Sequence, residues 1–384
     1  MNKRIIFLRS GYDDTTDPRM EKEIFSLYQA GYKVKVIAWD RSKNIDSIIV
    51  VNIKGIDIKF YMIGIKGEYG LGMSATLKGM IAFNRQLLGL LVKYRKSYDF
   101  IHACDFDTVL PAFIVSKHYK KKIIYDIFDY YADSHFMPKT VAAVIRKVDT
   151  FIINHVDAVI LCNEERINQI KPAHPKKLSI VHNTPDFNIK DLTKEDIKSE
   201  KNNQISIVYV GRLESSGRFL KEIVDIISED NRFVLHIGGG GPLQEYIAKK
   251  SKDSPNIIFY GSMKYADVIK LENQCDVMTA IYDPLLKNHR YAAPNKFYEA
   301  LMLGKPLIVM ENTGIDKIVA GENLGWVIKQ DESFEVGFKR ALNQIVTLSD
   351  HFSSYKEPMT SIYKDHYQWE VMSKRLVSLY DELG

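Results

Sequence analysis

Short runs rich in isoleucine and valine alternate with longer amphipathic stretches along almost the whole chain. This alternation is typical of β-α-β units, in which helices separate the buried strands of a parallel sheet. In the first half it predicts strands at residues 5–8, 34–38, 100–102, 123–125, 158–161 and 179–181. In the second half it predicts strands at residues 205–210, 233–237, 257–260, 277–280, 306–309 and 326–328. The predicted fold class is therefore α/β.

The length of the chain favours two such sheets. A single core rarely grows beyond about 250–300 residues, whereas this chain has 384. A polar stretch at residues 186–204 interrupts the alternation and predicts a linker. We therefore expect one doubly wound domain at residues 1–185 and another at residues 205–365. Ligands of such sheets bind beyond the carboxyl ends of the strands, so the loops there are the first candidates for a site.

The composition excludes several classes of protein. The three cysteines, Cys104, Cys162 and Cys275, are far apart and indicate a reducing cytosol and no zinc site. The apolar run at residues 5–8 is shorter than the core of a signal peptide, and no later run approaches the roughly 20 apolar residues of a membrane span. We expect a cytoplasmic protein, soluble or peripheral on the inner face of the cell membrane, that needs no cofactor.

The net charge of +5 is mild, but positive side chains gather between residues 85 and 147. They are either solvated helix faces or a surface for anionic lipid, and we expect no nucleic-acid partner. A leucine-rich stretch at residues 85–96 predicts a helix that either packs on the sheet or lies in a membrane interface. The glycine-rich segment at residues 64–79 predicts a mobile loop that faces the acceptor or lipid.

The clearest chemical signal lies at residues 294–306. Pro294 stands where a helix can begin and Gly304 where it can end, with Glu299 about one turn inside. A helix start offers unpaired amide donors and a partial positive charge, which suit a diphosphate. Glu299 is then placed to accept hydrogen bonds from ribose hydroxyls. Alone, however, the segment is more typical of an ordinary capped helix.

Two glycine-containing loops follow predicted strands in the same half. Gly211 and Arg212 come directly after the strand at residues 205–210, from where a guanidinium can reach a phosphate with two hydrogen bonds. Glycines 238–241 follow the next strand and open a helix, which lets the backbone approach a ligand closely. Phosphate-compatible loops at successive strand ends predict a nucleotide site.

In this order, and with Asn256 to Gly261 between them, the motifs resemble the donor domain of glycosyltransferase family 4. The resemblance implies retaining enzymes of GT-B fold, with two Rossmann-like domains facing across a cleft and a UDP- or GDP-linked sugar as the donor. It also implies that Arg212 binds the diphosphate, that the base lies against residues 260–263 and that Glu299 binds the ribose. The donor-binding residues implied are Gly11, Arg212, Arg218, Gly239, Gly240, Tyr260, Gly261, Met263, Pro294, Asn295, Lys296 and Glu299.

The chain departs from the family pattern at two places. Many members carry a glutamate that contacts the donor sugar eight positions before Glu299, where this chain has Tyr291. Many also carry Lys-Gly shortly after the Gly-Arg-Leu motif, where this chain has Ser215 to Arg218. The identity of the sugar therefore stays open, and the second cation for the diphosphate is either Arg218 or Lys296.

Polar residues after the strands of the first half are the candidates for acceptor binding. They are His102, Asp105, Asp126 and Asp129. Asp105 is also the candidate auxiliary base, so that the expected catalytic residues are Asp105, Arg212 and Glu299. The Asp-x-Asp spacing of Asp105 and Asp107 lies in the acceptor half, so we expect no catalytic metal. Cations and helix-start amides would stabilise the leaving group instead.

The resemblance implies a hexosyltransferase that acts on a saccharide or lipid-linked acceptor, in the synthesis of bacterial surface polysaccharide or glycolipid. It also implies that the amphipathic segment at residues 366–384 forms a helix that crosses back onto the first domain. Two alternatives stay open. One is a nucleotide-sugar 2-epimerase of the same fold, and the other is a non-catalytic subunit that binds a sugar nucleotide.

Overall fold

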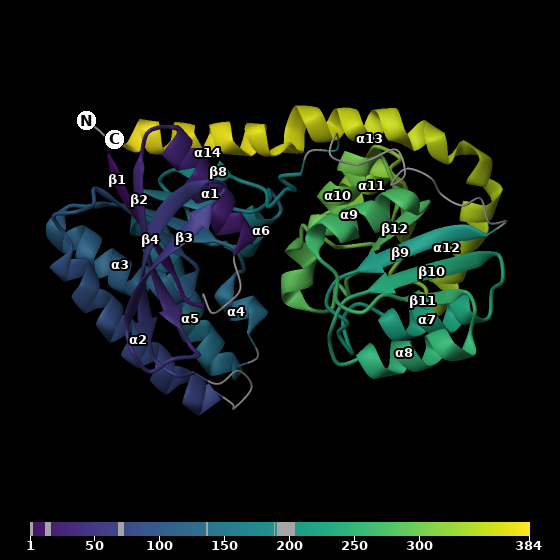
Figure 1. Ribbon diagram of the computed structural model, residues 1–384, viewed down its shortest axis with the longest axis horizontal. Helices are drawn as coiled ribbons and strands as arrows, with labels where there is room; N and C mark the ends of the chain where they lie inside the picture. Colours follow the sequence, from purple (N-terminus) through teal and green to yellow (C-terminus); the bar gives the residue numbers. More distant parts are fainter. Residues whose placement is uncertain (1–2, 12–16, 68–72, 136, 188, 190–203) are drawn as a thin grey trace. The chain divides into compact units, whose positions relative to one another are not determined.

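The computed structural model of the protein describes residues 3–11, 17–67, 73–135, 137–187, 189 and 204–384 (Figure 1). The chain divides into two compact units. The first consists of Met1–Asn183 with Glu370–Gly384, and the second of Thr184–Trp369. Most of the expected linker at residues 186–204 lies outside the described residues.

In the described part of the first unit, an eight-stranded sheet has the order β3-β4-β2-β1-β5-β6-β7-β8. Its strands are β1 (Arg4–Arg9), β2 (Lys33–Asp40), β3 (Ser47–Ile53), β4 (Ile56–Gly64), β5 (Phe100–Cys104), β6 (Lys122–Ile127), β7 (Ala158–Leu161) and β8 (Leu178–Ile180). Neighbouring strands are parallel except for the antiparallel pair of β3 and β4. The strand order reverses between β1 and β5, and the loops at such a switch point are where doubly wound sheets bind ligands.

Helices cover both faces of this sheet. They are α1 (Pro18–Gln29), α2 (Met73–Lys93), α3 (Phe106–Tyr119), α4 (Tyr131–Ser134), α5 (Lys139–His155), α6 (Arg166–Gln169) and α14 (Trp369–Leu383). On one face, α2, α3 and α5 bury residues such as Val109 and Ile152. On the other face, His102 of β5 contacts Glu23 of α1 and Tyr380 of α14. Among the described helices, none has both the length and the apolar character needed to cross a bilayer.

The hairpin of β3 and β4 was not predicted. Its two turn residues, Lys54 and Gly55, have φ of 49° and 86°, as a two-residue type I′ turn requires. An antiparallel hairpin needs no helix between its strands. It therefore falls outside the alternation from which the other strands were predicted.

The long loop expected at residues 64–79 is also wrong in part. Gly64 ends β4 and α2 begins at Met73, while residues 68–72 lie outside the described part of the chain. Gly79, which suggested a loop, lies within α2, and a Cβ at this position would be 3.3 Å from the indole of Trp39. Gly79 therefore allows α2 to pack closely against the sheet and does not mark a loop.

The second unit contains a fully parallel sheet of six described strands, in the order β11-β10-β9-β12-β13-β14. The strands are β9 (Ile205–Val210), β10 (Phe233–Gly238), β11 (Ile257–Phe259), β12 (Val277–Ala280), β13 (Leu307–Met310) and β14 (Gly325–Ile328). This is the order of a doubly wound Rossmann sheet, with its switch point between β9 and β12. The predicted strands of this half agree with the structure to within one residue at each end.

The helices of the second unit also form two layers. They are α7 (Leu220–Ser228), α8 (Gln244–Asp253), α9 (Tyr265–Gln274), α10 (Asn295–Leu303), α11 (Asp316–Gly321), α12 (Phe334–Thr347) and α13 (Lys356–Ile362), with shorter turns at Lys287–Tyr291, Ser349–Tyr355 and Tyr363–Tyr367. α7, α8 and α12 pack on one face, and α9, α10, α11 and α13 on the other. The predicted limits of α10 are confirmed, since Pro294 is its N-cap and Gly304, with φ of 68°, its C-cap.

Candidate functional site

Two glycine loops of the second unit lie backbone against backbone at the carboxyl ends of β9 and β10. The amide of Gly211 donates to the carbonyl of Gly238 (3.0 Å), and the amide of Leu213 donates to that of Gly240 (3.0 Å). A Cβ on Gly239 would lie 1.8 Å from the carbonyl oxygen of Gly211. The loops therefore expose backbone and exclude side chains, as a close phosphate contact requires.

The loop after β11 joins this glycine surface. The carbonyl of Gly261 accepts a hydrogen bond from the amide of Gly239 (2.6 Å), and the sulfur of Met263 packs against the glycine loop after β10. The hydroxyl of Tyr260 is paired with Nδ1 of His236 at 2.8 Å. Three of the predicted donor residues thus come together here, and the ring of Tyr260 lies at their exposed edge.

Two cations stand beside the same loops. The ammonium of Lys296, in the first turn of α10, lies 4.7 Å from the centre of the Tyr209 ring and 2.7 Å from where a Cβ of Gly211 would be. Arg218 donates to the hydroxyl of Tyr209 (3.0 Å), and its guanidinium lies 4.9 Å from the centre of the Tyr282 ring. Within the described part of the chain, neither cation forms an ion pair with a carboxylate. Cations with no carboxylate oxygen within ion-pair distance can bind an anionic ligand at this point.

Both side chains stay positively charged. Burial opposes the charge of Lys296, but the neighbouring oxygens of Tyr282 and Tyr209 and the charge of Glu299 outweigh it, and the pKa of Lys296 is raised. Burial likewise opposes the charge of Arg218, whose pKa is nevertheless raised by the same two tyrosines. Because these cations follow β9 and β12, positive charge is concentrated at the switch point of the sheet.

Arg212 is placed differently. Its side chain is 69% exposed, and its Nε donates to Glu214 at 2.5 Å. Its ion pair with Glu214 therefore competes with the binding of a phosphate. The sequence did not distinguish Arg218 from Lys296 as the second cation for the diphosphate. In the structure, both side chains contact Tyr209.

Glu299 lies one turn inside α10, which begins at Asn295 after Pro294. The side chain is buried, and Glu272 of α9 stands near it. Burial and then the charge of Glu299 raise the pKa of Glu272 well above its ordinary value. The Oε2 atom of Glu272 is buried and has no hydrogen-bond partner among the described residues. Burial and the neighbouring charge of Glu299 thus favour the protonated form of Glu272.

Sequence reasoning gave no role to Tyr209, Tyr282 or Glu272. The strand alternation places Tyr209 on the opposite face of the sheet from Val208 and Val210. It does not reveal that Arg218 and Lys296, from two later segments, both contact the side chain of Tyr209. No local pattern distinguishes Glu272 from the solvated acids of other helices.

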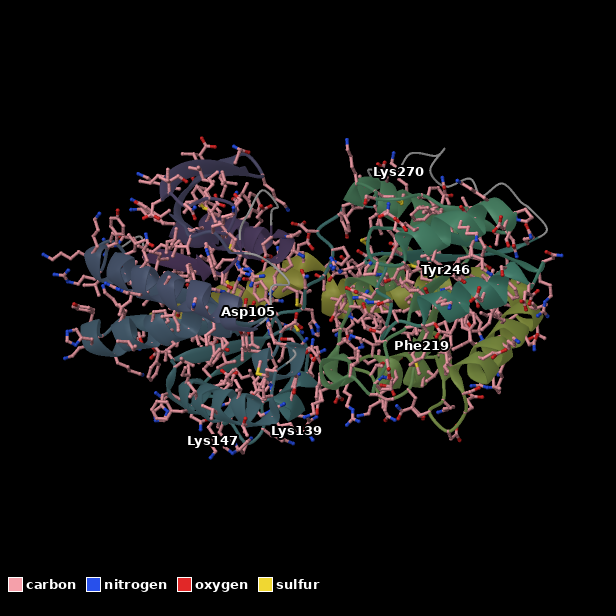
Figure 2. The ribbon with its side chains drawn as sticks, turned by 90° about the horizontal axis from the view of Figure 1, so that it is seen from below. Asp105, Lys139, Lys147, Phe219, Tyr246 and Lys270 are labelled. Carbon is pink, nitrogen blue, oxygen red and sulfur yellow. The ribbon has the colours of Figure 1, made fainter. Side chains whose placement is uncertain are left out.

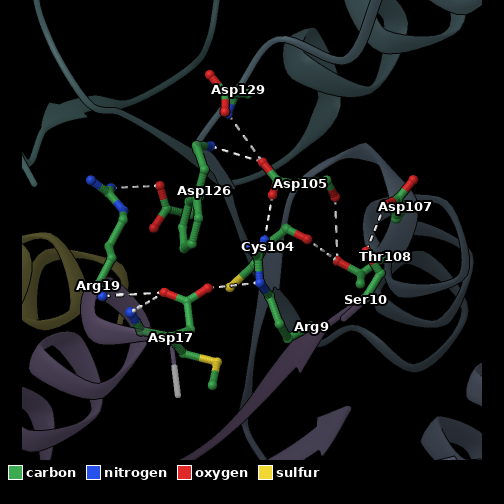
Figure 3. Close-up of polar contacts among 12 residues, drawn as sticks. Arg9, Ser10, Asp17, Arg19, Cys104, Asp105, Asp107, Thr108, Asp126 and Asp129 are labelled. Carbon is green, nitrogen blue, oxygen red and sulfur yellow. Dashed lines mark hydrogen bonds and ion pairs between the residues drawn. The ribbon is translucent and has the colours of Figure 1, made fainter. Parts of the chain in front are cut away.

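In the first unit, Asp105 stands at the carboxyl end of β5, beside the switch point (Figure 3). Its Oδ1 accepts hydrogen bonds from the amides of Phe128 (2.9 Å) and Asp129 (3.3 Å), and its Oδ2 from Arg9. Its φ of 61° is rare for a residue with a Cβ. Burial raises the pKa of Asp105 to about 6, although the charge of Arg9 opposes the rise. Gly11, the remaining donor candidate, follows β1 in this unit.

Two arginines that sequence reasoning had left without a role organise this region. The guanidinium groups of Arg9 and Arg19 lie 4.6 Å and 4.7 Å from the centre of the Phe128 ring. Arg9 also pairs with Asp17 (2.9 Å), and Arg19 with Asp126 (2.8 Å). This network, drawn in Figure 3, fixes the loop whose amides donate hydrogen bonds to Asp105.

His102 and Asp126 belong to the core, with 0% exposure. Nε2 of His102 lies 3.3 Å from Asp126, and its Nδ1 lies 2.7 Å from the hydroxyl of Tyr380. Burial lowers the pKa of His102, which favours the neutral ring. Two of the four acceptor-side candidates therefore support the site from within, whereas Asp105 and Asp129 lie nearer its surface.

Solved structures of the same fold cover the whole chain. Anabaena Alr3699/HepE in complex with UDP is 15% identical, with a TM-score of 0.70 over 99% of this chain and 100% of that chain. Sucrose-phosphate synthase from Thermosynechococcus elongatus is 13% identical (TM-score 0.74, 99% of both chains). The lipopolysaccharide outer core galactosyltransferase WaaB is 15% identical (TM-score 0.68, 99% of both chains). At such identities the likeness shows the fold alone, and that fold is GT-B.

The comparison of sequences is more local. Residues 204–347 match the family Glycosyl transferases group 1. They include the glycine loops, both cations and α10. No curated protein matches the chain.

Proposed function

We propose that this chain is a glycosyltransferase that moves a hexose from a nucleoside-diphosphate sugar to a saccharide or lipid-linked acceptor. The family match over residues 204–347 and the GT-B fold support the class of reaction, and HepE, a protein of the same fold, binds UDP. The observation that carries the proposal is the position of two cations, Lys296 and Arg218, beside the glycine loops. Among the described residues, neither has a carboxylate oxygen within ion-pair distance.

We assign the donor to the second unit. Amides of the glycine loops and of the first turn of α10 would donate hydrogen bonds to the diphosphate, while Lys296 and Arg218 would supply positive charge. Glu299 would accept hydrogen bonds from the ribose, and the base would lie against residues 260–263. Arg212 would join once its side chain leaves Glu214.

We further propose that transfer retains the configuration of the sugar. The bond between the anomeric carbon and the diphosphate oxygen breaks, and a bond to the acceptor hydroxyl oxygen forms on the same face. The departing diphosphate takes the hydroxyl proton, and Lys296, Arg218 and helix-start amides stabilise its developing charge. Asp105 is assigned to the acceptor, where its carboxylate can orient the hydroxyl or assist in removing the proton.

We place the reaction in the synthesis of a bacterial surface polysaccharide or glycolipid, at the inner face of the cell membrane. The lipopolysaccharide galactosyltransferase among the structures of this fold motivates that choice. A lipid-linked acceptor would bring the enzyme to the membrane without a spanning helix.

The test is calorimetric titration of the protein with UDP, GDP, ADP and TDP. One diphosphate should bind selectively, and Lys296→Ala and Arg218→Ala should each weaken it by roughly 10- to 100-fold, the effect of losing a charged hydrogen bond. Lys252→Ala, at an exposed position on α8, is the matched control and should bind as the wild type does. Unchanged affinity in both site variants, with circular dichroism showing intact folds, would sink the assignment.

A further inference from the structure

The outer sides of α2, α3 and α5 form one continuous surface of the first unit. Asn84 of α2 donates a hydrogen bond to the carbonyl of Asp107 in α3 (3.0 Å). Phe113 of α3 packs edge-on against Phe151 of α5, with ring centres 5.9 Å apart. We call the solvent-exposed side chains of these three helices the helical face.

The helical face carries a group of exposed apolar side chains. They are Ile81 on α2, Leu110 and Ile114 on α3, and Val144 and Phe151 on α5, each between 43% and 62% exposed. Residues four or seven positions apart lie on the same side of a helix, so the apolar side chains of α3 and of α5 form two stripes. Single exposed apolar residues are common, whereas a group on adjoining helices indicates a binding surface.

Cations surround these stripes. The exposed basic residues of the helical face are Lys78 and Arg85 on α2, Lys93 at its end, Lys117 on α3, and Lys139 and Lys147 on α5. Figure 2 labels Lys139 and Lys147, which lie at the lower margin of the first unit in that view. Arg146 is not part of this set because it pairs with Asp133.

The three helices themselves contribute few acidic residues to this surface, although Asp46, just before β3, accepts a hydrogen bond from Gln86 of α2. α2 contains no aspartate or glutamate, α3 contains only Asp107, and α5 only Asp149. Asp149 is fully buried, and Asp107 accepts a hydrogen bond from Ser10 (2.6 Å) at the first turn of α3. Among the described residues of the three helices, no carboxylate stands beside the exposed lysines to neutralise them.

We infer that the helical face binds the surface of a bilayer that contains anionic lipid. Lysine and arginine attract anionic headgroups, and partly exposed leucine, isoleucine, valine and phenylalanine enter the boundary between headgroups and acyl chains. A nucleic acid would neutralise the same charges but would leave the apolar stripes in water. The inference rests on the proposed function in one respect: membrane binding would bring the enzyme to a lipid-linked acceptor.

Vesicle co-sedimentation tests the inference directly. The full chain should bind vesicles of phosphatidylglycerol and phosphatidylcholine at low salt, and binding should weaken as salt increases. Lys139→Gln with Lys147→Gln should lower the partition coefficient about 30-fold, since each lysine near an anionic surface contributes on the order of a factor of five. Ile114→Gln with Val144→Gln should also weaken binding, by about tenfold or more, because it removes apolar contacts without removing charge.

The matched control changes the same charge elsewhere. Lys249→Gln with Lys252→Gln neutralises two exposed lysines of α8 in the second unit and should leave vesicle binding unchanged. Absence of binding at low salt, equal binding to vesicles of phosphatidylcholine alone, or an equal loss in the control variant would each overturn the inference. Calorimetric nucleotide binding, measured on the same variants and expected to be unchanged, separates this outcome from a failure of the proposed donor site.

Discussion

At Gly239, two constraints act on one residue. Its φ of 130° is in a region that side chains rarely adopt, and the carbonyl oxygen of Gly211 occupies the place of a Cβ. The same residue joins the loops after β9, β10 and β11, since its amide also donates to Gly261. A substitution here must therefore displace backbone on the glycine surface.

Gly239→Ala should weaken diphosphate binding by at least about tenfold, because strained backbone alone costs of the order of 1–3 kcal/mol and the contact with Gly211 adds to it. Gly321→Ala is the control, since a Cβ there meets nothing within 4 Å and the residue lies in α11. Calorimetry and thermal melting of both variants check the prediction. Equal affinity in the two variants would show that the glycine surface does not bind the donor.

The carboxyl group of Asp105 should make the rate of the reaction depend on pH, with a limb of the pH–rate profile that rises near pH 6. Burial raises its pKa to about 6, so its ionised fraction, and with it any assistance to the acceptor hydroxyl, increases as pH rises through that value. Asp105→Asn should lower the rate of nucleotide release from the donor about 100-fold and abolish this limb. Asp107→Asn is the neighbouring control and should keep this pH dependence, shifted to lower pH because the charge of Asp107 contributes to the raised pKa of Asp105. A limb near pH 6 that persists in Asp105→Asn would assign it to another group.

The order of the motifs identified the loops of the candidate site. It did not identify which basic side chains lie beside those loops. Arg212 is the residue that the resemblance implies, yet its side chain pairs with Glu214 at the surface. Lys296 and Arg218 reach Tyr209 because α10 and the loop after β9 pack on the same strand end. Such a convergence of distant segments has no local signature in the sequence.

At the scale of helices and strands, the alternation of short apolar runs predicted the parallel strands of both described sheets except β4, which pairs in parallel with β2. It did so because most of these strands are largely buried and a crossover connection separates each from the next parallel strand. It did not predict the β3–β4 hairpin, where the chain turns back without a helix. It also did not distinguish a glycine that lets Trp39 approach a helix from a glycine in a loop.

Helix α5 presents cations to solvent and a carboxyl group to the core. Burial raises the pKa of Asp149, on its inner side, from 3.8 to about 7. The folded state therefore binds a proton that the unfolded state releases, over the range from about pH 4 to about pH 7. Stability from this group is present below that range and is lost as pH rises through it.

Asp149→Asn should remove this loss, because the amide keeps the shape of the neutral carboxyl group and does not ionise. The wild type should lose up to about 4 kcal/mol relative to the variant between these limits, the value of three pKa units. Urea unfolding of both proteins across the range measures the difference. Parallel pH profiles for the two proteins would show that Asp149 ionises normally in the folded state.

At the scale of the whole chain, the first unit is assembled from two distant segments. The chain leaves it after Asn183 and returns at Glu370, where α14 closes the face opposite α2, α3 and α5. Tyr380 of α14 contacts His102 at 2.7 Å, and Asp381 accepts a hydrogen bond from Tyr32 at 2.6 Å. The helical layer on this face of the first sheet is therefore incomplete without residues 370–384.

Deletion of residues 370–384 should consequently destabilise the first unit and spare the second, whose own core does not include them. Loss of the buried side chains Met372, Leu376 and Tyr380 alone should cost several kcal/mol, at roughly 2–5 kcal/mol for each large core residue. Scanning calorimetry should then show an early or absent transition for the first unit, and a retained transition for the second with nucleotide binding intact. Tyr380→Phe, which removes only the hydroxyl bound to His102, is the matched control and should lower stability by about 1–3 kcal/mol. A single unchanged transition after the deletion would mean that α14 contributes nothing to the first core, which its buried contacts argue against.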